Sequence, residues 1–446
     1  MRHGKLAIVA LLLLGIAAAG FASGKDEGSA AANPSGAPVL LKWWGGVPAE
    51  YGPEIVVKMF NEAYKDKGIQ AEYVRYVNDD TGNVKLETTL LSGGDIDVFM
   101  TYNASNLYKR GTGGMTLELG AMLKKAKFDV LKELGDGAAP YIYDGKYYGL
   151  PTKMENYFLL ANKNMFDAAG IPLPESWTYD DFRKVAKQLT KGEGQNKIYG
   201  MYWNSAQEIF RPSYICQRVL GPNFLYKEGG KETNLDHPEF VQFNQMVQDM
   251  MWVDKSTITH TDHVTQKLSV ESTFLAGKAA MSVGVWTIRS IKDLAKYPHD
   301  FVTAYLPVPV SSKSKAKYGI GEGVIGDYIC INPQTKSPDQ SFEFLLWYIK
   351  GGMLGGTPYD RVPIYKGISP EKIADEYMKN GDTILDRATV IKFLTPAKNM
   401  AVSVETNKLP EIWKTWCDAL ELVYTNQKSA AAALGKAKIK ADAFLK

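Results

Sequence analysis

The sequence predicts an α/β protein with two domains, and three observations support this prediction. The chain has 446 residues, which is enough for two domains with complete hydrophobic cores. Between Val39 and Tyr102, short apolar segments typical of strands alternate with amphipathic segments typical of helices. Glycines such as Gly68 follow the helical segments and mark where they end. The alternation indicates a parallel sheet covered by helices.

The expected elements follow one another closely along the chain. In the first part we expect strands at 39–44, 69–77 and 95–102, and helices at 54–67 and 84–91. Thr178 and Asp181 then have the spacing of a capping box, which opens a helix. Ser337 and Pro338 mark the start of another helix. The remaining expected elements are strands at 301–310 and 328–331 and two helices from about residue 410.

The N-terminus predicts an exported protein. A basic start precedes an uncharged stretch at 6–22, which has the length of a signal-peptide core and is short for a membrane span. We therefore expect a signal peptide at 1–24, with a retained membrane anchor as the weaker alternative. Residues 25–38 are rich in Gly, Ser, Ala and Pro and are expected to form a disordered leader.

The charge balance argues against nucleic acid as a partner. The chain has 52 lysine and arginine residues against 49 aspartate and glutamate residues. Loss of Arg2 and Lys5 with the signal peptide leaves 50 against 49, so the mature chain is nearly neutral. The three cysteines, Cys216, Cys330 and Cys417, are widely spaced in apolar surroundings. They predict unpaired thiols and form neither a disulfide framework nor a zinc motif.

We expect no cofactor and no metal. The segment 321–326 has the glycine spacing of a dinucleotide-binding fingerprint, but a strand follows it where the fingerprint requires a helix. His260 and His263 lack a well-placed third ligand and are expected in a solvated loop. Asp95 and Asp97 lie two residues apart on one strand, which leaves no room for a sugar between the carboxyl groups of a glycosidase pair.

The segment from Phe274 to Trp286 is the most informative part of the chain. It combines a helix end, a stop at Gly277, a short buried strand and Gly284 before an aromatic residue. A lone tryptophan is more often part of a core. The whole pattern, Phe-x-x-Gly-Lys-Ala-Ala-Met-x-x-x-Gly-x-Trp, resembles a segment of bacterial extracellular solute-binding proteins of the sugar-binding class. In that family the terminal aromatic residue stacks on the ligand.

Four further segments resemble the same family and occur in the same order. They are Leu91–Phe99, the Asp-Gly hairpin that leads into Pro151, the run 162–178, and Tyr199-Gly200. Ala161 and Ser176 depart from the usual Tyr and Thr of the family, both at scaffold positions. Many relatives are lipoproteins, but Gly24 stands where their acylated Cys would be, so we expect a periplasmic or extracellular protein without a lipid anchor.

The resemblance implies the two-lobed periplasmic-binding-protein fold of type II, with lobes joined by three hinge crossings. The expected N-lobe comprises 39–152 and 306–360, and the expected C-lobe comprises 153–305 and 361–446. The implied function is the extracytoplasmic binding component of an ABC importer, without enzymatic activity. Its expected partners are a carbohydrate ligand and the permease subunits, and we expect a monomer.

Sugar binding needs aromatic rings for the apolar face of a pyranose and polar side chains for its hydroxyls. The candidates lie at expected strand ends, at family positions or between the lobes. They are Trp286, Trp413, Trp44, Tyr102, Asn103, Glu155, Trp203, Glu322 and Arg361. Two alternatives stay open: a secreted carbohydrate-active enzyme, or a binding protein of the same fold for a non-sugar solute. Because Arg361 is a cation near the third crossing, an acidic sugar stays an alternative ligand.

Overall fold

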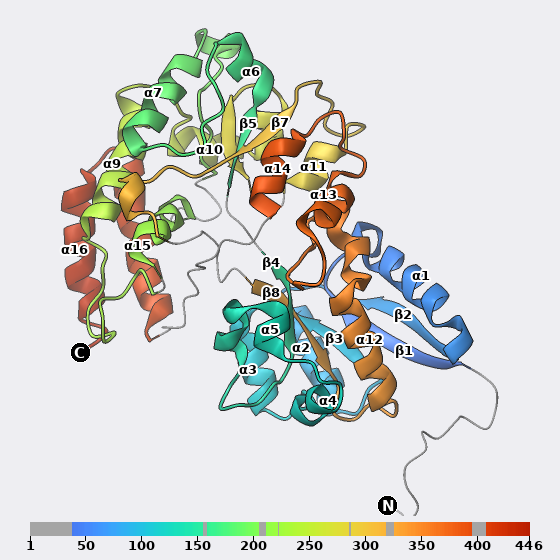
Figure 1. The fold of residues 1–446 in the computed structure, drawn as a ribbon. Helices are drawn as coiled ribbons and strands as arrows, with labels where there is room; N and C mark the ends of the chain where they lie inside the picture. The colour runs from blue at the N-terminus through green and yellow to red at the C-terminus, as the bar shows by residue number, and fades with distance from the viewer. Residues whose placement is uncertain are drawn as a thin grey trace, which may run out of the picture. The chain divides into compact units, whose positions relative to one another are not determined.

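The computed structural model describes residues 38–154, 158–204, 211–221, 223–284, 287–317, 325–394 and 407–446 (Figure 1). The predicted signal peptide and nearly all of the predicted leader lie outside these ranges. Within them the chain forms one sheet of six strands and one of three, each with helices packed around it.

The six-stranded sheet combines parallel and antiparallel pairs. Its order is β2 (Ile69–Arg75), β1 (Val39–Gly45), β3 (Val98–Thr101), β8 (Ile325–Ile331), β4 (Leu150–Met154) and β9 (Val362–Pro363). The first three strands in this order are parallel, as the alternation of strands and helices predicts. β8 and β9 return from distant parts of the chain and pair antiparallel. The prediction of a parallel sheet is therefore correct only for β1, β2 and β3.

Helices cover this sheet and close its core. They are α1 (Pro53–Ala63), α2 (Asp80–Leu91), α3 (Ala104–Thr112), α4 (Gly120–Lys125), α5 (Val130–Leu134) and α12 (Pro338–Lys350). α1 and α12 contact one another and the β1–β2 side of the sheet, and α3 contacts β3 (Figure 1). Trp43 of β1 lies 5.5 Å from the ring of Phe344 on α12, which in turn lies 4.8 Å from the ring of Phe60 on α1. These buried rings join both helices to the sheet.

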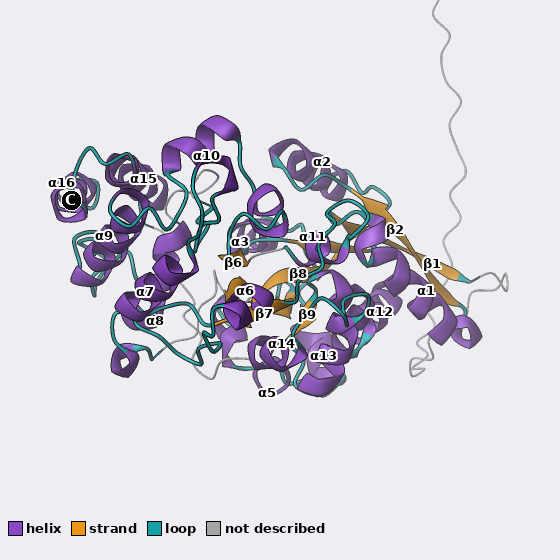
Figure 2. Ribbon diagram, turned by 90° about the horizontal axis from the view of Figure 1, so that it is seen from above, coloured by secondary structure: helices purple, strands orange, loops and turns teal. Residues whose placement is uncertain are grey.

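The three-stranded sheet is antiparallel, in the order β6 (Met281–Gly284), β5 (Phe158–Asn162) and β7 (Thr303–Leu306). Nine further α-helices of the described residues are α6 (Lys163–Ala168), α7 (Tyr179–Leu189), α8 (Gln217–Leu220), α9 (Pro238–Trp252), α10 (His260–Gln266), α11 (Ile288–Lys292), α13 (Pro370–Met378), α14 (Arg387–Leu394) and α15 (Leu409–Tyr424). The last helix is α16 (Ala430–Asp442), which packs with α9 and α15 (Figure 2). Thr178 and Asp181 form the predicted capping box of α7.

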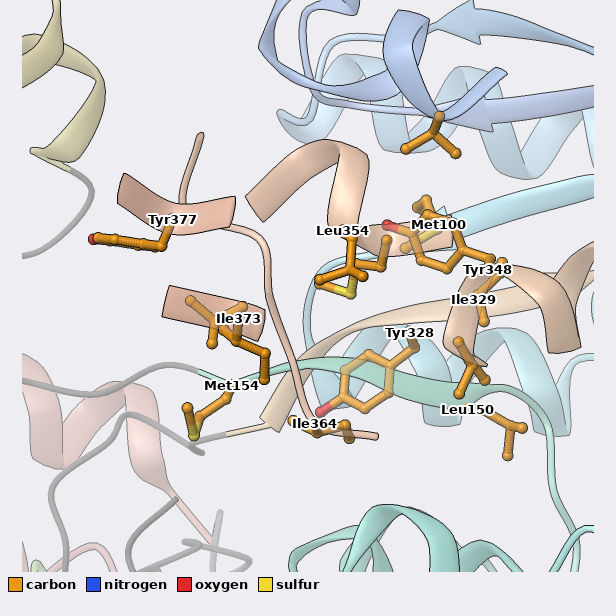
Figure 3. Close-up of a cluster of buried hydrophobic side chains, with 14 of the residues drawn as sticks. Met100, Leu150, Met154, Tyr328, Ile329, Tyr348, Leu354, Ile364, Ile373 and Tyr377 are labelled. Carbon is orange, nitrogen blue, oxygen red and sulfur yellow. The ribbon is translucent and has the colours of Figure 1, made fainter. Parts of the chain in front are cut away.

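The predicted lobe boundaries need small corrections. Lys153 pairs with Pro363 and Met154 with Val362, so all four residues belong to the six-stranded sheet and not to the second lobe. Leu306 pairs with Leu159 in the three-stranded sheet. Figure 3 shows Met154, Tyr328 and Ile364 in one cluster of buried apolar side chains near these strands. The strands extend one to three residues past the predicted boundaries, because backbone pairing continues to Met154, Leu306 and Pro363.

The expectation that His260 and His263 lie in a solvated loop is wrong. His260 and His263 lie on α10, not in a solvated loop, and both side chains are buried. Nδ1 of His263 is 2.7 Å from the hydroxyl of Tyr202, whose O–H donates to the carbonyl oxygen of Leu268. Among the described residues, no group of three or more His, Cys, Asp or Glu side chains is arranged to hold a metal ion.

Several local predictions are confirmed by the backbone. Asp144 and Gly145 both have positive φ, at 51° and 75°, as a two-residue hairpin turn of type I′ requires. Gly277 takes the left-handed conformation, with φ of 71°. Gly200 lies so close to α7 that a Cβ atom there would be 1.8 Å from the carbonyl oxygen of Ala186. The Tyr199-Gly200 step is therefore fixed by close backbone packing.

We predict that Gly200→Ala destabilises the protein by about 1–3 kcal/mol or more, because the new methyl group overlaps the backbone of α7. Gly435→Ala is the matched control, since Gly435 lies within α16 and a Cβ there meets no atom within 4 Å. That control should be stabilised by about 1 kcal/mol through helix propensity. Urea denaturation of the three proteins measures both effects. Equal stability of the Gly200 variant and the wild type would contradict the packing explanation.

Candidate functional site

Predicted site residues meet where strands of the six-stranded sheet end. Trp44 is the penultimate residue of β1, and Tyr102 follows β3 directly. The backbone N–H of Gly46 donates to the hydroxyl of Tyr102 at 2.6 Å, which joins the two strand ends. A Cβ atom at Gly46 would lie 2.9 Å from the Tyr102 ring, so the glycine permits this approach. Burial raises the pKa of Tyr102 well above its ordinary value, so its hydroxyl stays protonated.

A small cavity lies beside these strand ends. Its volume is about 20 Å³, and Trp43, Tyr51, Tyr102, Asp327 and Arg361 are among the side chains that line it. Pockets that hold organic ligands are typically about 300–1,000 Å³. The cavity alone is therefore too small for a sugar ring. Its lining nevertheless shows that aromatic and charged side chains gather at one edge of the sheet.

Two ion pairs lie where β4, β8 and β9 meet. Nη1 of Arg361 contacts the carboxylate of Asp327, and Nζ of Lys153 lies 3.4 Å from the carboxylate of Asp360. All four side chains are largely buried, with between 1% and 19% of each exposed. Burial alone lowers the pKa of Arg361, but the attraction of Asp327 and Asp360 outweighs it, so the pKa is raised overall.

The same region carries backbone strain. Asp327 has φ of 51° within β8, a conformation that residues other than glycine rarely adopt inside a strand. The hydroxyl of Thr152 donates to its carbonyl oxygen at 2.5 Å, which holds the strained residue against β4. Strained residues of this kind cluster at ligand sites and hinges. Asp327 is not among the residues predicted from sequence, because an aspartate within an apolar strand gives no sign of its backbone conformation.

Two cations of α11 bind carbonyl oxygens at the end of the helical segment Gly352–Tyr359. Nε and Nη2 of Arg289 each lie 3.3 Å from the Tyr359 oxygen, and the guanidinium lies 4.8 Å from the centre of the Tyr51 ring. Nζ of Lys292 donates to the Pro358 oxygen at 3.0 Å. Burial lowers the pKa of Lys292 to about 8. α11 begins two residues after Trp286, so these contacts anchor the chain beside that residue.

The structure separates the remaining candidates. Trp413 lies on α15 and is partly exposed, with its ring 6.0 Å from that of Trp416 and nearly perpendicular to it. Trp203 is only 1% exposed and packs near the rings of Phe182 and Phe243. We therefore correct Trp203 from a ligand candidate to a core residue, because neither face of its ring is open.

Asn103 has a local structural role. It is the N-cap of α3, and its side-chain oxygen accepts a hydrogen bond from the backbone N–H of Asn106 at 2.7 Å. The residue is exposed, so a contact from its amide to a ligand stays a prediction.

Glu155, Glu322 and Trp286 lie outside the described residues, but the strands that lead to them are paired. Met154, which precedes Glu155, pairs with Ile325, which comes three residues after Glu322. The first residue of β5, Phe158, pairs with Gly284, which comes two residues before Trp286. The three predicted ligand residues thus lie within one to three residues of paired strand ends.

The chain is similar in sequence to a known protein family and to a sugar-binding protein. The family described as bacterial extracellular solute-binding protein matches residues 11–350. An arabinooligosaccharide-binding protein of Halalkalibacterium halodurans is 27% identical over 113 residues, which cover 25% of this chain and 24% of that protein. The match thus spans about a quarter of that relative's length.

Solved structures are similar over nearly the whole chain. An ABC substrate-binding protein of Listeria monocytogenes in complex with cycloalternan has a TM-score of 0.68 and 18% identity, covering 91% of this chain and 98% of that one. A sugar transporter of Rhizobium etli in an open conformation has a TM-score of 0.69 and 19% identity, covering 91% and 99%. These likenesses confirm the predicted two-lobed α/β fold. Among the described residues, no helix has the length and apolar character to cross a bilayer.

We predict that Arg361→Met destabilises the protein by about 3–5 kcal/mol, because it leaves the carboxylate of Asp327 buried without its cation. The double variant with Asp327→Asn should lose less than the sum of the two single variants, since both charges are then removed. Asn tolerates the left-handed backbone at position 327. Arg387→Met is the matched control, because its pair with Asp375 is exposed and contributes about 1 kcal/mol at most. Additive effects in a denaturation cycle would contradict the coupling.

Proposed function

Because the chain belongs to the bacterial extracellular solute-binding protein family, we propose that it binds a carbohydrate between two lobes and delivers it to the permease of an ABC importer. The observation that carries this proposal is the family match over 11–350, which includes all the segments that lead to Trp286, Glu155 and Glu322. Sugar-binding relatives and structures among its matches support the ligand class.

The chemistry of the candidate residues supports the same class. Trp286 and Trp413 would cover the apolar face of a sugar ring from the C-lobe, with Trp44 and Tyr102 on the N-lobe side. The sugar hydroxyls would form hydrogen bonds with the side chains of Glu155, Glu322, Asn103 and Arg361. The charged side chains among them make stronger hydrogen bonds than a neutral side chain does. Arg361 is already paired with Asp327, so it reaches a ligand only through donors that this pair leaves free.

The proposed working mechanism is closure of the lobes about the three chain crossings, which we expect just past the strand ends at Met154, Leu306 and Pro363. A few residues at each crossing absorb the change in φ and ψ, and each lobe moves as a unit. A ligand that touches both lobes only in the closed form favours that form by the difference in affinity. The mature protein, which we propose to be exported without a lipid anchor and to act as a monomer, binds the solute and breaks no bond in it.

Two alternatives are separated by experiment. A secreted carbohydrate-active enzyme would share the aromatic residues but would need a positioned pair of acid and base groups. Turnover of oligosaccharides by the purified protein would favour it. A non-sugar ligand would be favoured if the protein is stabilised by peptides or polyamines and by no carbohydrate. Neither alternative has a specific feature of the described residues in its favour.

We predict that a thermal-shift screen against mono- and oligosaccharides identifies a stabilising carbohydrate, because binding to the folded state alone raises its stability. Trp286→Ala and Trp413→Ala should then each weaken binding by about 1–3 kcal/mol, which is roughly tenfold or more. Trp252→Ala is the matched control, since Trp252 is 38% exposed on α9 and is not a candidate. Calorimetry that finds wild-type affinity in both test variants would overturn the two assignments.

Closure of the lobes over a ligand should make the protein more compact in solution. The free protein should be open on average, and a saturating carbohydrate should decrease its radius of gyration by small-angle scattering. A sugar that does not stabilise the protein in the thermal-shift screen serves as the control for solvent contrast. Superimposable scattering curves with and without the bound carbohydrate would falsify closure while leaving the binding function intact.

A further inference from the structure

A second cavity lies at one end of the three-stranded sheet. Its volume is about 350 Å³, within the range of about 300–1,000 Å³ that is typical of pockets for organic ligands. Asn162, the last residue of β5, lines it together with Phe301, which comes two residues before β7. At the other end of β5, Phe158 pairs with Gly284, which leads to Trp286. The strand separates these two ends by about 13 Å, so the cavity is distinct from the predicted sugar site.

The walls of this cavity are fixed by hydrogen bonds. The side-chain oxygen Oδ1 of Asn162 accepts from the backbone N–H of Met165 at 3.1 Å, which ties the end of β5 to α6. Lys191 and Ile198, which also line the cavity, exchange two backbone hydrogen bonds at 2.9 and 2.8 Å. A wall that is already ordered loses little conformational freedom when a ligand binds.

Three polar groups of the cavity have no partner within the part of the chain that the structure describes. Asn162 is only 3% exposed, and its Nδ2 atom donates to no described residue. Lys191 and Asp300 also line the cavity, and neither forms an ion pair with the other or with any other described residue. A buried donor without a partner costs free energy, which a ligand that accepts from it would recover. The groups left for a ligand are therefore one amide donor, one cation and one anion.

Apolar side chains form much of the remaining lining. They are Met165 and Ala168 of α6, Leu189 of α7, Ile198 and Phe301. An apolar surface beside an unpaired cation and an unpaired anion complements a small molecule that has an apolar group, a carboxylate and an ammonium. A neutral sugar has no charged group and would use neither Lys191 nor Asp300.

We propose that this cavity is a second ligand site, which binds a free α-amino acid with an apolar side chain. The carboxylate of the amino acid accepts from Lys191 and from Nδ2 of Asn162, and its ammonium donates to Asp300. Hydrogen bonds between charged groups are the stronger ones, so a ligand that lacks either charge is disfavoured. The apolar side chain of the ligand lies against the apolar lining. This inference goes beyond the proposed carbohydrate function and does not rest on it, because the two sites lie at opposite ends of β5.

The test uses the full mature chain, isotopically labelled in its methionine methyl groups and titrated with L-leucine and L-phenylalanine. Met165 lines the cavity and its NMR signal is assigned with Met165→Leu. Met100 lines the small cavity beside the strand ends and is the internal control, assigned with Met100→Leu. We expect at least one of the two amino acids to shift the Met165 signal to saturation and to leave the Met100 signal in place. Leucinamide lacks the carboxylate and 4-methylpentanoate lacks the ammonium, so each should bind about tenfold more weakly than L-leucine or less.

Substitutions in the cavity test the same contacts. Lys191→Met and Asp300→Asn should each weaken binding of the amino acid about tenfold. Ala168→Trp, at an exposed position of the lining, should fill the cavity and abolish binding. Lys278→Met is the matched control, since Lys278 is an exposed lysine that does not line the cavity. An unchanged melting temperature of each variant confirms that these exposed substitutions leave the fold intact.

Each other outcome overturns the site. A Met165 signal that neither amino acid shifts, up to the solubility limit of each, shows that the cavity does not take this ligand. Binding that Ala168→Trp retains lies elsewhere on the protein. Wild-type affinity in both Lys191→Met and Asp300→Asn, or equal binding of leucinamide and 4-methylpentanoate, contradicts recognition of the two charges. The carbohydrate screen is a separate measurement, so its failure would overturn the proposed function and leave this site standing.

Discussion

The burial of charge where β4, β8 and β9 meet is the constraint on which the rest of the structure depends. Arg361 and Asp327, with Lys153 and Asp360, place four largely buried charges among three strands. Removing an ion from water costs several kcal/mol, and only a well-placed partner offsets this cost. The partners therefore have to keep their positions whenever the chain is folded. This fixes the register of the strands that lead out of the six-stranded sheet.

α11 adds a second link to the same region. Its two cations reach carbonyl oxygens of Pro358 and Tyr359, next to Asp360. Carbonyl oxygens at the end of a helical segment carry partial negative charge, so cations are stabilised there. Burial of the Lys292 ammonium group removes it from water, which disfavours its charged form and lowers its pKa to about 8. Below that pH the buried ammonium carries its full desolvation penalty, which is relieved as pH rises from 8 toward the ordinary lysine value.

Local features of the fold could be predicted from sequence, because each depends on neighbours in the chain. The capping box at Thr178, the turn at Asp144 and the stop at Gly277 are of this kind. The antiparallel pairing of β8 was missed, since its partners lie more than 150 residues away and leave no pattern in its own sequence. Trp203 and Trp413 look alike in the sequence, and only the packing around them separates the core residue from the partly exposed one.

The central place of β8 has a consequence for how the chain reaches its native state. β3 and β4 do not touch each other; β8 lies between them and supplies hydrogen bonds to both. Until residue 331 has been made, the first 154 residues carry two strands with open edges, and open edges invite pairing with other chains. Long-range pairing of this sort is also slow to form. During synthesis the growing chain therefore has an incomplete sheet, which only the later strands β8 and β9 complete. Because of this topology, the chain needs protection from aggregation until those strands have been made.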